Sequence, residues 1–397
     1  MPDTPLYLDY AASAPLRPEA RRARDAHEAA PWAGANPNSL HSLGRAAARE
    51  LDRARAELAR ALGGRVRPAD VLLTSGGTES NNLAVMGLAE GARARDARRR
   101  RVVLSAIEHD SVLDLVAPLH ERGFEVDLVR PGRDGVVGVP ALEDALDESC
   151  ALVSVMAANN ETGVAQPVAG LARAAHAAGA LFHTDAVQAF GHLPLDLSEA
   201  DAVSVAAHKL GGPVGVGALA VRGRTPLRPQ SFGGGQERGL RAGTQDVSGA
   251  AQFAAVARAA AEGLAETAAL VSARSRALQE RLCAPGTGVV PTTDVPYDGS
   301  RLPGIVSVMV PSLDSETLIL ELDQRGFEVS AGSACTSGSL DPSHVLSAMG
   351  IDRTSALGSL RISFDERVGE ADLERLADAL LDVVAAHAHG GPRRTAR

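Results

Sequence analysis

Residues 201–223 read DAVSVAAHKLGGPVGVGALAVRG and place a lysine between two apolar runs. An apolar strand is predicted over residues 202–206, a glycine-rich turn follows, and a second apolar strand is predicted over residues 214–221. Lys209 therefore follows the end of a buried strand instead of lying on a solvated helix face. Because burial disfavours the ammonium form, we expect this amine to lose its proton more easily than an exposed lysine.

Lys209 is the only lysine of the chain, and every other residue among its 40 lysines and arginines is an arginine. Arginine therefore provides the positive charges on the surface of this protein. An arginine cannot lose its proton in a protein, whereas a buried lysine can act as a base or form a Schiff base. A leftover surface lysine is the alternative, but the position at a strand end favours a chemical role.

Short apolar strands alternate with alanine-rich helical stretches around this segment. Strands are predicted at RVVLSA (101–106), FEVDLV (124–129), CALVSVMA (150–157), ALFHTDA (180–186) and ADAVSVAA (200–207), with helices at 110–122, 140–148 and 167–178. The alternation predicts an α/β fold with a mostly parallel sheet covered by helices. On such sheets, ligands bind outside the carboxyl ends of the strands.

The second half of the chain predicts a smaller α+β domain. A long helix over 248–284 precedes strands at 304–310, 327–330 and 360–364 and helices at 314–325, 342–349 and 369–388. We place a large domain over residues 15–260 and a small domain over residues 1–14 and 261–390, with the N-terminal segment folding back onto it. Residues 391–397 are expected to form a disordered tail.

Composition excludes several classes of protein. The net charge of −9 argues against binding to nucleic acid or to an anionic membrane. No apolar run approaches the roughly 18 residues of a membrane span, and the N-terminus lacks the pattern of a signal peptide. Three widely spaced cysteines describe neither a disulfide framework nor a metal site. We therefore expect a cytoplasmic enzyme with no metal.

Polar residues gather at the predicted strand ends. In TSGGTESNN (74–82) a strand leads into a helix start, where free N–H groups and the Thr78 hydroxyl suit an anion. Asp185 needs a cationic partner, such as a protonated heterocyclic nitrogen, and the ring of His109 could cover a planar ligand. Each could instead cap a turn, but with Lys209 they match one cofactor, pyridoxal 5′-phosphate.

The whole chain resembles the cysteine desulfurases, which are fold-type I, class V aminotransferase-like pyridoxal-phosphate enzymes. The resemblance rests on YLDYAASAP (7–15), NPNSLHSLGRAA (36–47), TSGGTESNN (74–82), EHDSV (108–112), NNETG (159–163), HTDAVQ (183–188), AHKLGGPVGVG (207–217), GGGQERGLRAGT (233–244), SAGSACTSG (330–338) and SLRIS (359–363). It implies a seven-stranded, mostly parallel sheet in the large domain and a homodimer with active sites at the interface.

The resemblance also implies a role for each matching residue. Lys209 would bind the cofactor covalently, Asp185 would pair with its pyridine nitrogen, Gln188 would bond its phenolic oxygen, and His109 would stack on its ring and move protons. Three residues would hold the phosphate, namely Gly77, Thr78 and His208. Thr244 would reach the phosphate in the neighbouring subunit. Asn159 and Arg361 would bind the substrate carboxylate, for which a planar guanidinium is well suited.

Cys335 indicates the reaction. It lies in a run of small residues (331–338), which we expect to be mobile and exposed, whereas Cys150 and Cys283 fit buried structural positions. In the implied reaction, Lys209 removes the α-proton of L-cysteine and the Cys335 thiolate attacks the substrate sulfur. L-alanine leaves, and a persulfide remains on Cys335 for a sulfur-acceptor protein.

Some alternatives stay open at this point. A selenocysteine lyase, or another class V enzyme such as an aminotransferase, would also keep Lys209 and Asp185, and a cofactor-free scaffold for sulfur-transfer partners is conceivable. The acceptor could serve iron–sulfur cluster assembly, tRNA thiolation, DNA phosphorothioation or cofactor synthesis. The chain departs from the family at Ala206, where a hydroxyl residue usually bonds the phosphate, and at Asp365, where glycine is common.

Overall fold

A computed structural model describes residues 5–63, 65–332 and 341–390, with side chains described up to residue 387. Its centre is a seven-stranded sheet in the order β2-β8-β7-β6-β5-β3-β4. The strands are β2 (Val71–Thr74), β3 (Arg101–Ser105), β4 (Glu125–Val129), β5 (Cys150–Ser154), β6 (Leu181–Asp185), β7 (Ala202–Ala206) and β8 (Gly217–Val221). Only β8 runs antiparallel to its neighbours, so the prediction of a mostly parallel sheet is confirmed.

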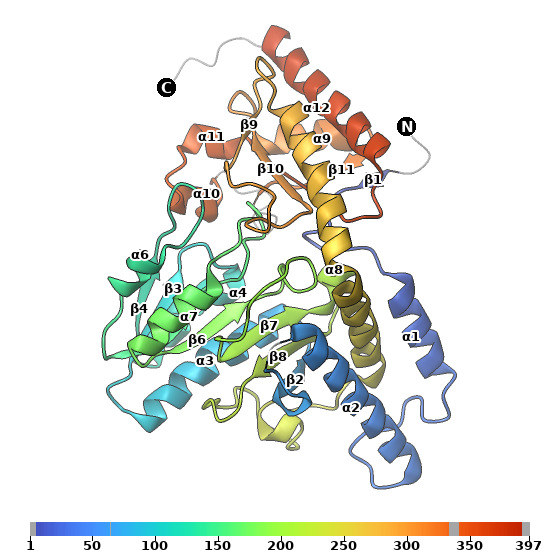
Figure 1. Cartoon of the computed structure of the whole chain (residues 1–397), viewed down its shortest axis with the longest axis vertical. Helices are drawn as coiled ribbons and strands as arrows, with labels where there is room; N and C mark the ends of the chain where they lie inside the picture. Colours follow the sequence, from blue (N-terminus) through green and yellow to red (C-terminus); the bar gives the residue numbers. More distant parts are fainter. Residues whose placement is uncertain (1–4, 64, 333–340, 391–397) are drawn as a thin grey trace.

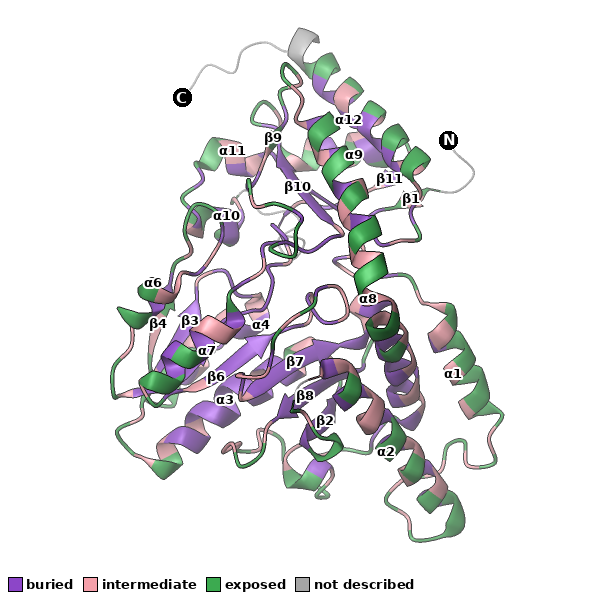
Figure 2. Cartoon of the chain, viewed as in Figure 1, coloured by how far each residue is buried: buried purple, intermediate pink, exposed green. Residues whose placement is uncertain are grey.

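The sheet is covered on both faces, which explains its nearly continuous apolar strands. Every residue of β2, β5, β7 and β8 is buried, and Figure 2 shows the centre of the sheet in the colour of buried residues. α3 (Gly77–Arg95) packs against β5, β6, β7 and β8, and α7 (Val168–Ala177) packs against β5 and β6. The sheet is therefore a rigid platform whose edges, and not its faces, are open to ligands.

The other helices surround this platform and the upper part of the molecule in Figure 1. They are α1 (Pro18–Glu28), α2 (Ser42–Leu62), α4 (Asp110–Leu113), α5 (Val116–Glu121), α6 (Val139–Glu143), α9 (Ser315–Asp323), α10 (His344–Ala348), α11 (Arg353–Leu357) and α12 (Glu370–Gly390), with 3-10 turns η1 (Pro68–Asp70), η2 (Ala207–Leu210) and η3 (Glu237–Gly239). In the described residues, no helix is long and apolar enough to cross a membrane.

The C-terminal part contains two small sheets. One has the order β12-β10-β9, from β9 (Val290–Pro291), β10 (Ile305–Met309) and β12 (Ser359–Ser363), and the other pairs β1 (Leu6–Tyr7) with β11 (Phe327–Glu328). The β1–β11 pairing is parallel, and Asp9 bridges to Ser363. The N-terminal segment thus pairs with strands of the C-terminal part.

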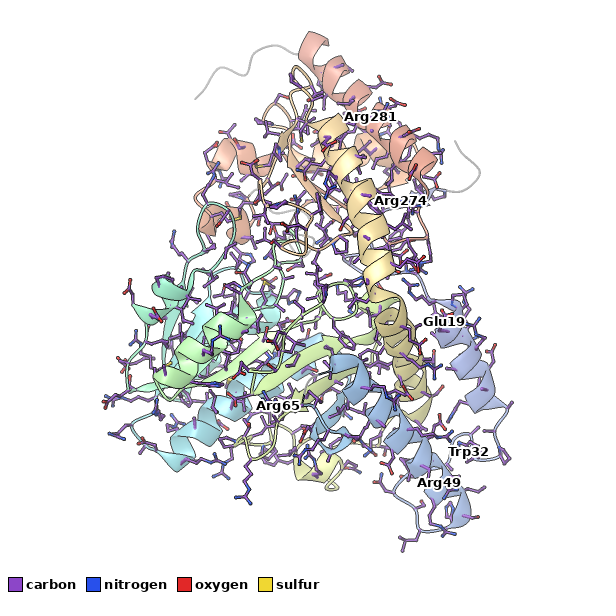
Figure 3. The ribbon with its side chains drawn as sticks, in the orientation of Figure 1. Glu19, Trp32, Arg49, Arg65, Arg274 and Arg281 are labelled. Carbon is purple, nitrogen blue, oxygen red and sulfur yellow. The ribbon has the colours of Figure 1, made fainter. Side chains whose placement is uncertain are left out.

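α8 (Val247–Leu282) connects the two parts as one continuous helix, and Figure 1 shows it rising from the sheet to the top of the molecule. Its first turns, up to Ala257, belong to the core around the sheet, and its last turns, from Val271, belong to the C-terminal core. Arg274 and Arg281 project from this second half, and both bond residues at or next to α12 (Figure 3). The domain boundary at residues 260 and 261 falls inside this helix and stays a prediction.

Two predictions about helices need correction. The helix predicted over 110–122 is broken into α4 and α5, because Pro118 has no N–H to donate to the carbonyl of Asp114 and the chain must start a new helix. The helix predicted over 140–148 ends at Glu143. The sequence analysis also did not predict α1 and α2, whose buried positions are small residues and leucines.

Candidate active site

The carboxyl ends of the parallel strands bring polar residues from separate stretches to one edge of the sheet. β6 ends at Asp185, and His109, Asn159 and Lys209 follow the ends of β3, β5 and β7 within a few residues. β2 runs antiparallel to β8, as β7 does, so it ends at the same edge and leads into α3. In an open α/β sheet, this edge is where a ligand is expected.

Lys209 lies in η2, directly after β7, and its side chain is partly buried. Its Nζ donates to the carbonyl oxygens of Ala11 at 2.6 Å and Ala12 at 2.8 Å. The Nε2 of Gln188 donates to the same Ala11 oxygen at 2.7 Å, so the N-terminal segment holds the amine and the amide side by side. A cavity borders both side chains and reaches His192.

Asp185 is a buried carboxylate that favours a cationic partner. Its Oδ1 accepts from the backbone N–H of Val187 at 2.8 Å, and its Oδ2 accepts from Nδ2 of Asn81 at 2.6 Å. Burial raises the pKa of Asp185, and these hydrogen bonds and the charge of Lys209 only partly oppose the increase. A cation placed against this carboxylate would therefore be stabilised strongly.

The start of α3 offers a possible anion site beside Asp185. Gly76 has a φ of +148°, which side chains rarely allow, and Ser80 N–H makes an early helical bond to its carbonyl. The N–H groups before Ser80 face out of the helix end, and Thr78 is exposed next to them. A Cβ on Gly77 would lie 2.9 Å from Cγ2 of Val187, so this glycine permits the close approach of helix and strand end.

Arg361 is almost completely buried in β12, with 1 % of its surface exposed. Its Nη1 donates to the carbonyl oxygen of Asn160 at 3.0 Å, and its Nη2 donates to Oδ1 of Asp9 at 2.7 Å. Its Nε is buried and has no hydrogen-bond partner among the described residues. A buried guanidinium with an unused N–H is typical of a site that binds a carboxylate from a ligand.

The side chain of Asn159 makes hydrogen bonds within the loop that follows β5. Its Oδ1 accepts from the backbone N–H groups of Glu161 and Thr162, each at 2.9 Å, and its Nδ2 donates to the carbonyl of Ile107 at 3.1 Å. The side chain is completely buried and holds the turn that carries Asn160 against Arg361. In this structure Asn159 shapes the loop, and its direct contact with a substrate stays a prediction.

A fixed loop carries Thr244. Glu237, in a left-handed backbone conformation with φ +46°, accepts from Arg55 at 2.6 Å, from Gln245 at 2.9 Å and from the N–H of Leu73 at 3.0 Å. A strained residue held by three partners is typical of a functional loop. Thr244 itself is exposed, in keeping with an expected contact outside its own subunit.

The same loop is tied to the start of α3. Arg241 donates to both carboxylate oxygens of Glu79, at 2.7 and 3.2 Å. Burial raises the pKa of Glu79, but the hydrogen bonds from Arg241 and Ser75 outweigh burial and leave it below its usual value. Arg241 thereby joins the loop that carries Thr244 to the first turn of α3.

His208 precedes the lysine and lies near the N-terminal segment, with Nδ1 3.4 Å from Oγ of Ser13. Burial and the charge of Lys209 lower the pKa of His208 to about 4. The imidazole is therefore neutral at pH 7 and offers one N–H donor.

Of the three cysteines, two lie within the described residues. Cys150 is completely buried in β5 and Cys283 is half-buried after α8. Burial raises the pKa of each thiol to about 11, so neither forms the reactive thiolate at neutral pH. Both fit the expected structural positions. Cys335 lies outside the described residues.

Two site residues, Asp9 and Asn81, were not given a role by the sequence reading. Asp9 faces Arg361 across 352 positions of sequence, and Asn81 faces Asp185 across 104. Both lie inside the quoted motifs YLDYAASAP and TSGGTESNN, so a signal was present. Their partners could not be identified from spacing because each pair meets only through the tertiary fold.

The two departures from the family have different surroundings. Ala206 is buried, and its Cβ lies 3.8 Å from the position that a Cβ on Gly77 would take, so no hydroxyl is available there. Asp365 accepts hydrogen bonds from Arg17 at 2.9 Å and from Arg367 at 2.7 Å. Burial raises its pKa, but the two guanidinium groups more than offset this and keep Asp365 ionised.

Comparison with known proteins gives a consistent result. The model of the family "Aminotransferase class-V" matches residues 6–376. An IscS-like cysteine desulfurase of Mycobacterium tuberculosis is 43% identical over 389 residues, which cover 96% of each chain. The cysteine desulfurase IscS of Dictyoglomus turgidum is 36% identical, covering 96% of this chain and 94% of its own. The solved structure of a NifS-like protein superposes with a TM-score of 0.87 at 34% identity, over 96% of this chain and 100% of the other.

Proposed function

Since this chain belongs to the aminotransferase class-V family and is a cysteine desulfurase of that family, we propose that its pyridoxal 5′-phosphate is held around Lys209 and that Cys335 receives the sulfur of L-cysteine. The observation that carries the proposal is Asp185, a buried carboxylate that favours a cation, at the same sheet edge as the only lysine. A protonated pyridine nitrogen is a cation of this kind.

The residues of this edge fit the cofactor group by group. Lys209 would bond its aldehyde and Asp185 its ring nitrogen, while Gln188 would reach its phenolic oxygen and His109 would cover its ring. The N–H groups at the start of α3, together with Gly77, Thr78 and His208, would hold its phosphate. When bound, the cofactor serves as an electron sink for the α-carbon of the amino acid.

The chain's own residues supply binding and proton transfer. Arg361 binds the substrate carboxylate through its unused Nε, and this contact fixes the α-carbon near Lys209. The amine of Lys209 takes the α-proton. The Cys335 thiolate then attacks the substrate sulfur: a sulfur–sulfur bond forms, the carbon–sulfur bond breaks, and the β-carbon gains a proton. Lys209 finally returns a proton to the α-carbon. Cysteine and the enzyme thiol thus become L-alanine and an enzyme persulfide.

We further propose that the enzyme works as a homodimer in the cytoplasm and passes the persulfide sulfur to an acceptor protein. Exposed apolar side chains support a second copy: Leu40 is 89 %, Val214 77 % and Phe232 85 % exposed. Leu40 and Phe232 lie in or beside the motifs NPNSLHSLGRAA and GGGQERGLRAGT, and the second of these carries Thr244. An exposed Thr244 could then complete the phosphate site of the other subunit.

Borohydride reduction of the full-length holoenzyme tests the cofactor site. The reagent locks a covalent bond between an amine and the cofactor, and peptide mapping by mass spectrometry then locates it. Because Lys209 is the only lysine, we expect the label on its peptide alone. Label on the N-terminal amine, or none on a yellow protein, would contradict the proposal.

The role of Cys335 is tested by a pair of variants. Cys335→Ala should retain the cofactor but lose persulfide formation and most alanine production, because no accessible thiolate remains. Cys283→Ala is the matched control and should keep both, since its thiol is half-buried with a raised pKa. Wild-type sulfide release by Cys335→Ala would refute the assignment.

A further inference from the structure

A chain of hydrogen bonds connects Asp185 to His109 through two residues with no assigned role. Asn81, on α3, is 1 % exposed, and its Nδ2 lies 2.6 Å from Oδ2 of Asp185 and 2.9 Å from Oγ of Ser111. Ser111, on α4, brings its Oγ to 2.9 Å from Nδ1 of His109. Its backbone N–H donates to the same Nδ1 at 3.0 Å.

The direction of this chain follows from what each atom can do. The carboxylate of Asp185 can only accept, so the group of Asn81 that faces it must be the amide nitrogen. Both N–H bonds of that nitrogen are then used, one on Asp185 and one on Ser111. The Ser111 hydroxyl accepts from Asn81 and has its own proton free to donate to His109.

The imidazole of His109 lies at the end of this series of hydrogen bonds. A backbone N–H can never accept, so Nδ1 of His109 is an acceptor and carries no proton. The hydroxyl of Ser111 adds a second donor to the same nitrogen. The ring proton of the neutral imidazole must then lie on Nε2, on the side away from α4.

We infer that Asn81 and Ser111 are positioning residues that hold His109 as the Nε2–H tautomer and fix its ring relative to Asp185. The inference rests on the proposed function for its consequence: His109 exchanges protons with bound molecules through Nε2 alone. A second tether supports it, because Asn82 donates to the carbonyl oxygen of Ser111 at 2.9 Å and so binds α4 to α3.

Nitrogen NMR of the full-length protein, labelled with ¹⁵N-histidine, tests the inference. The shifts of the two ring nitrogens report the tautomer, and His109→Gln identifies the signals of His109. We expect the Nε2–H pattern in the wild type. In Ser111→Ala one of the two donors to Nδ1 is lost, so the ratio of the Nε2–H tautomer to the Nδ1–H tautomer should fall by about three- to tenfold. Ser111→Thr, which keeps the hydroxyl, should restore it.

A matched control lies in the same sheet. Ser154 places its Oγ 2.8 Å from Nδ1 of His183, so Ser154→Ala should move the signals of His183 and leave those of His109 unchanged. A proton on Nδ1 of His109 in the wild type, or ring shifts of His109 that Ser111→Ala does not alter, would overturn the inference. Because the spectra need no turnover, these results are independent of the borohydride experiment, which tests the proposed function by itself.

Discussion

Arg361 illustrates how much of the site depends on single residues. Its guanidinium is held by the carboxylate of Asp9 on one side and by the Asn160 carbonyl on another, and its Nε has no partner among the described residues. A planar group fixed at two points presents its remaining edge in a defined direction, which suits a carboxylate. Asp9 also compensates the buried charge before a substrate arrives.

Arg361→Lys should therefore damage substrate binding without removing the charge. The ammonium cannot satisfy Asp9, Asn160 and a ligand in the same plane, and losing one or two charge-assisted hydrogen bonds corresponds to a KM for L-cysteine that rises about 10- to 100-fold. Initial rates of alanine formation measure this value. Arg375→Lys, at an exposed pair on α12, is the control and should stay within twofold. An unchanged KM for Arg361→Lys would exclude Arg361 from the binding site.

At the scale of the elements, three neighbouring strands are joined beneath the site by a polar bridge. His183, in the middle of β6, lies 2.8 Å from Oγ of Ser154 on β5 and 2.9 Å from Oγ of Ser204 on β7. The imidazole is completely buried, and burial lowers the pKa of His183 to about 3. The ring of His183 is therefore neutral at pH 7, so that one of its nitrogens donates to a serine hydroxyl and the other accepts from one.

This bridge predicts a specific acid sensitivity. Between about pH 6.5 and pH 3 the unfolded chain binds a proton on His183 and the folded protein does not, so stability is lost as the pH falls through this window. His183→Gln lacks this titration. The free energy of unfolding of this variant, measured with urea from pH 7 to pH 5, should fall less steeply than that of the wild type. The difference between the two slopes should reach at most about 1.4 kcal/mol per pH unit.

The comparison of slopes isolates His183, because His192 and His208, whose pKa values are also lowered by burial, remain in both proteins. The variant is expected to be less stable at pH 7, so the slope and not the absolute value is the test. Parallel pH profiles for the two proteins would show that His183 is not the buried neutral group described here.

The elements also show why the sequence predicted some parts and not others. β3, β5, β6 and β7 are buried almost throughout, and they could be recognised within one to three residues. β4 is more exposed and was predicted equally closely. α2 buries Ala47, Leu51, Ala54 and Leu58 at helical spacing between charged residues, so its amphipathic pattern was present in the sequence although no helix was predicted there. The motifs predicted the residues of the site, whereas the contacts of Asp9 with Arg361 and of Asn81 with Asp185 exist only in the folded chain.

At the scale of the whole molecule, the site is built from both parts of the chain. The sheet edge contributes Asp185 and Lys209, and the C-terminal part contributes Arg361 through β12. The N-terminal segment joins them, because Asp9 bonds Arg361 while the carbonyls of Ala11 and Ala12 receive Lys209. Residues 9–12 thus bring the guanidinium of Arg361 and the amine of Lys209 together, because they make hydrogen bonds to both.

A second copy of the chain would complete this arrangement, and Phe232 tests its presence. Its ring is 85 % exposed, one residue before the motif that carries Thr244, and an aromatic ring of this kind is costly to leave in water. Phe232→Asp should weaken the dimer at least tenfold, seen as a shift toward monomer in sedimentation at micromolar concentration. The cofactor content should fall with it, because Thr244 of the second copy is lost from the phosphate site.

Leu320→Asp, at an apolar residue on α9 that is 53 % exposed, should remain dimeric with full cofactor. If Phe232→Asp sediments as the wild type does, this face is not the interface.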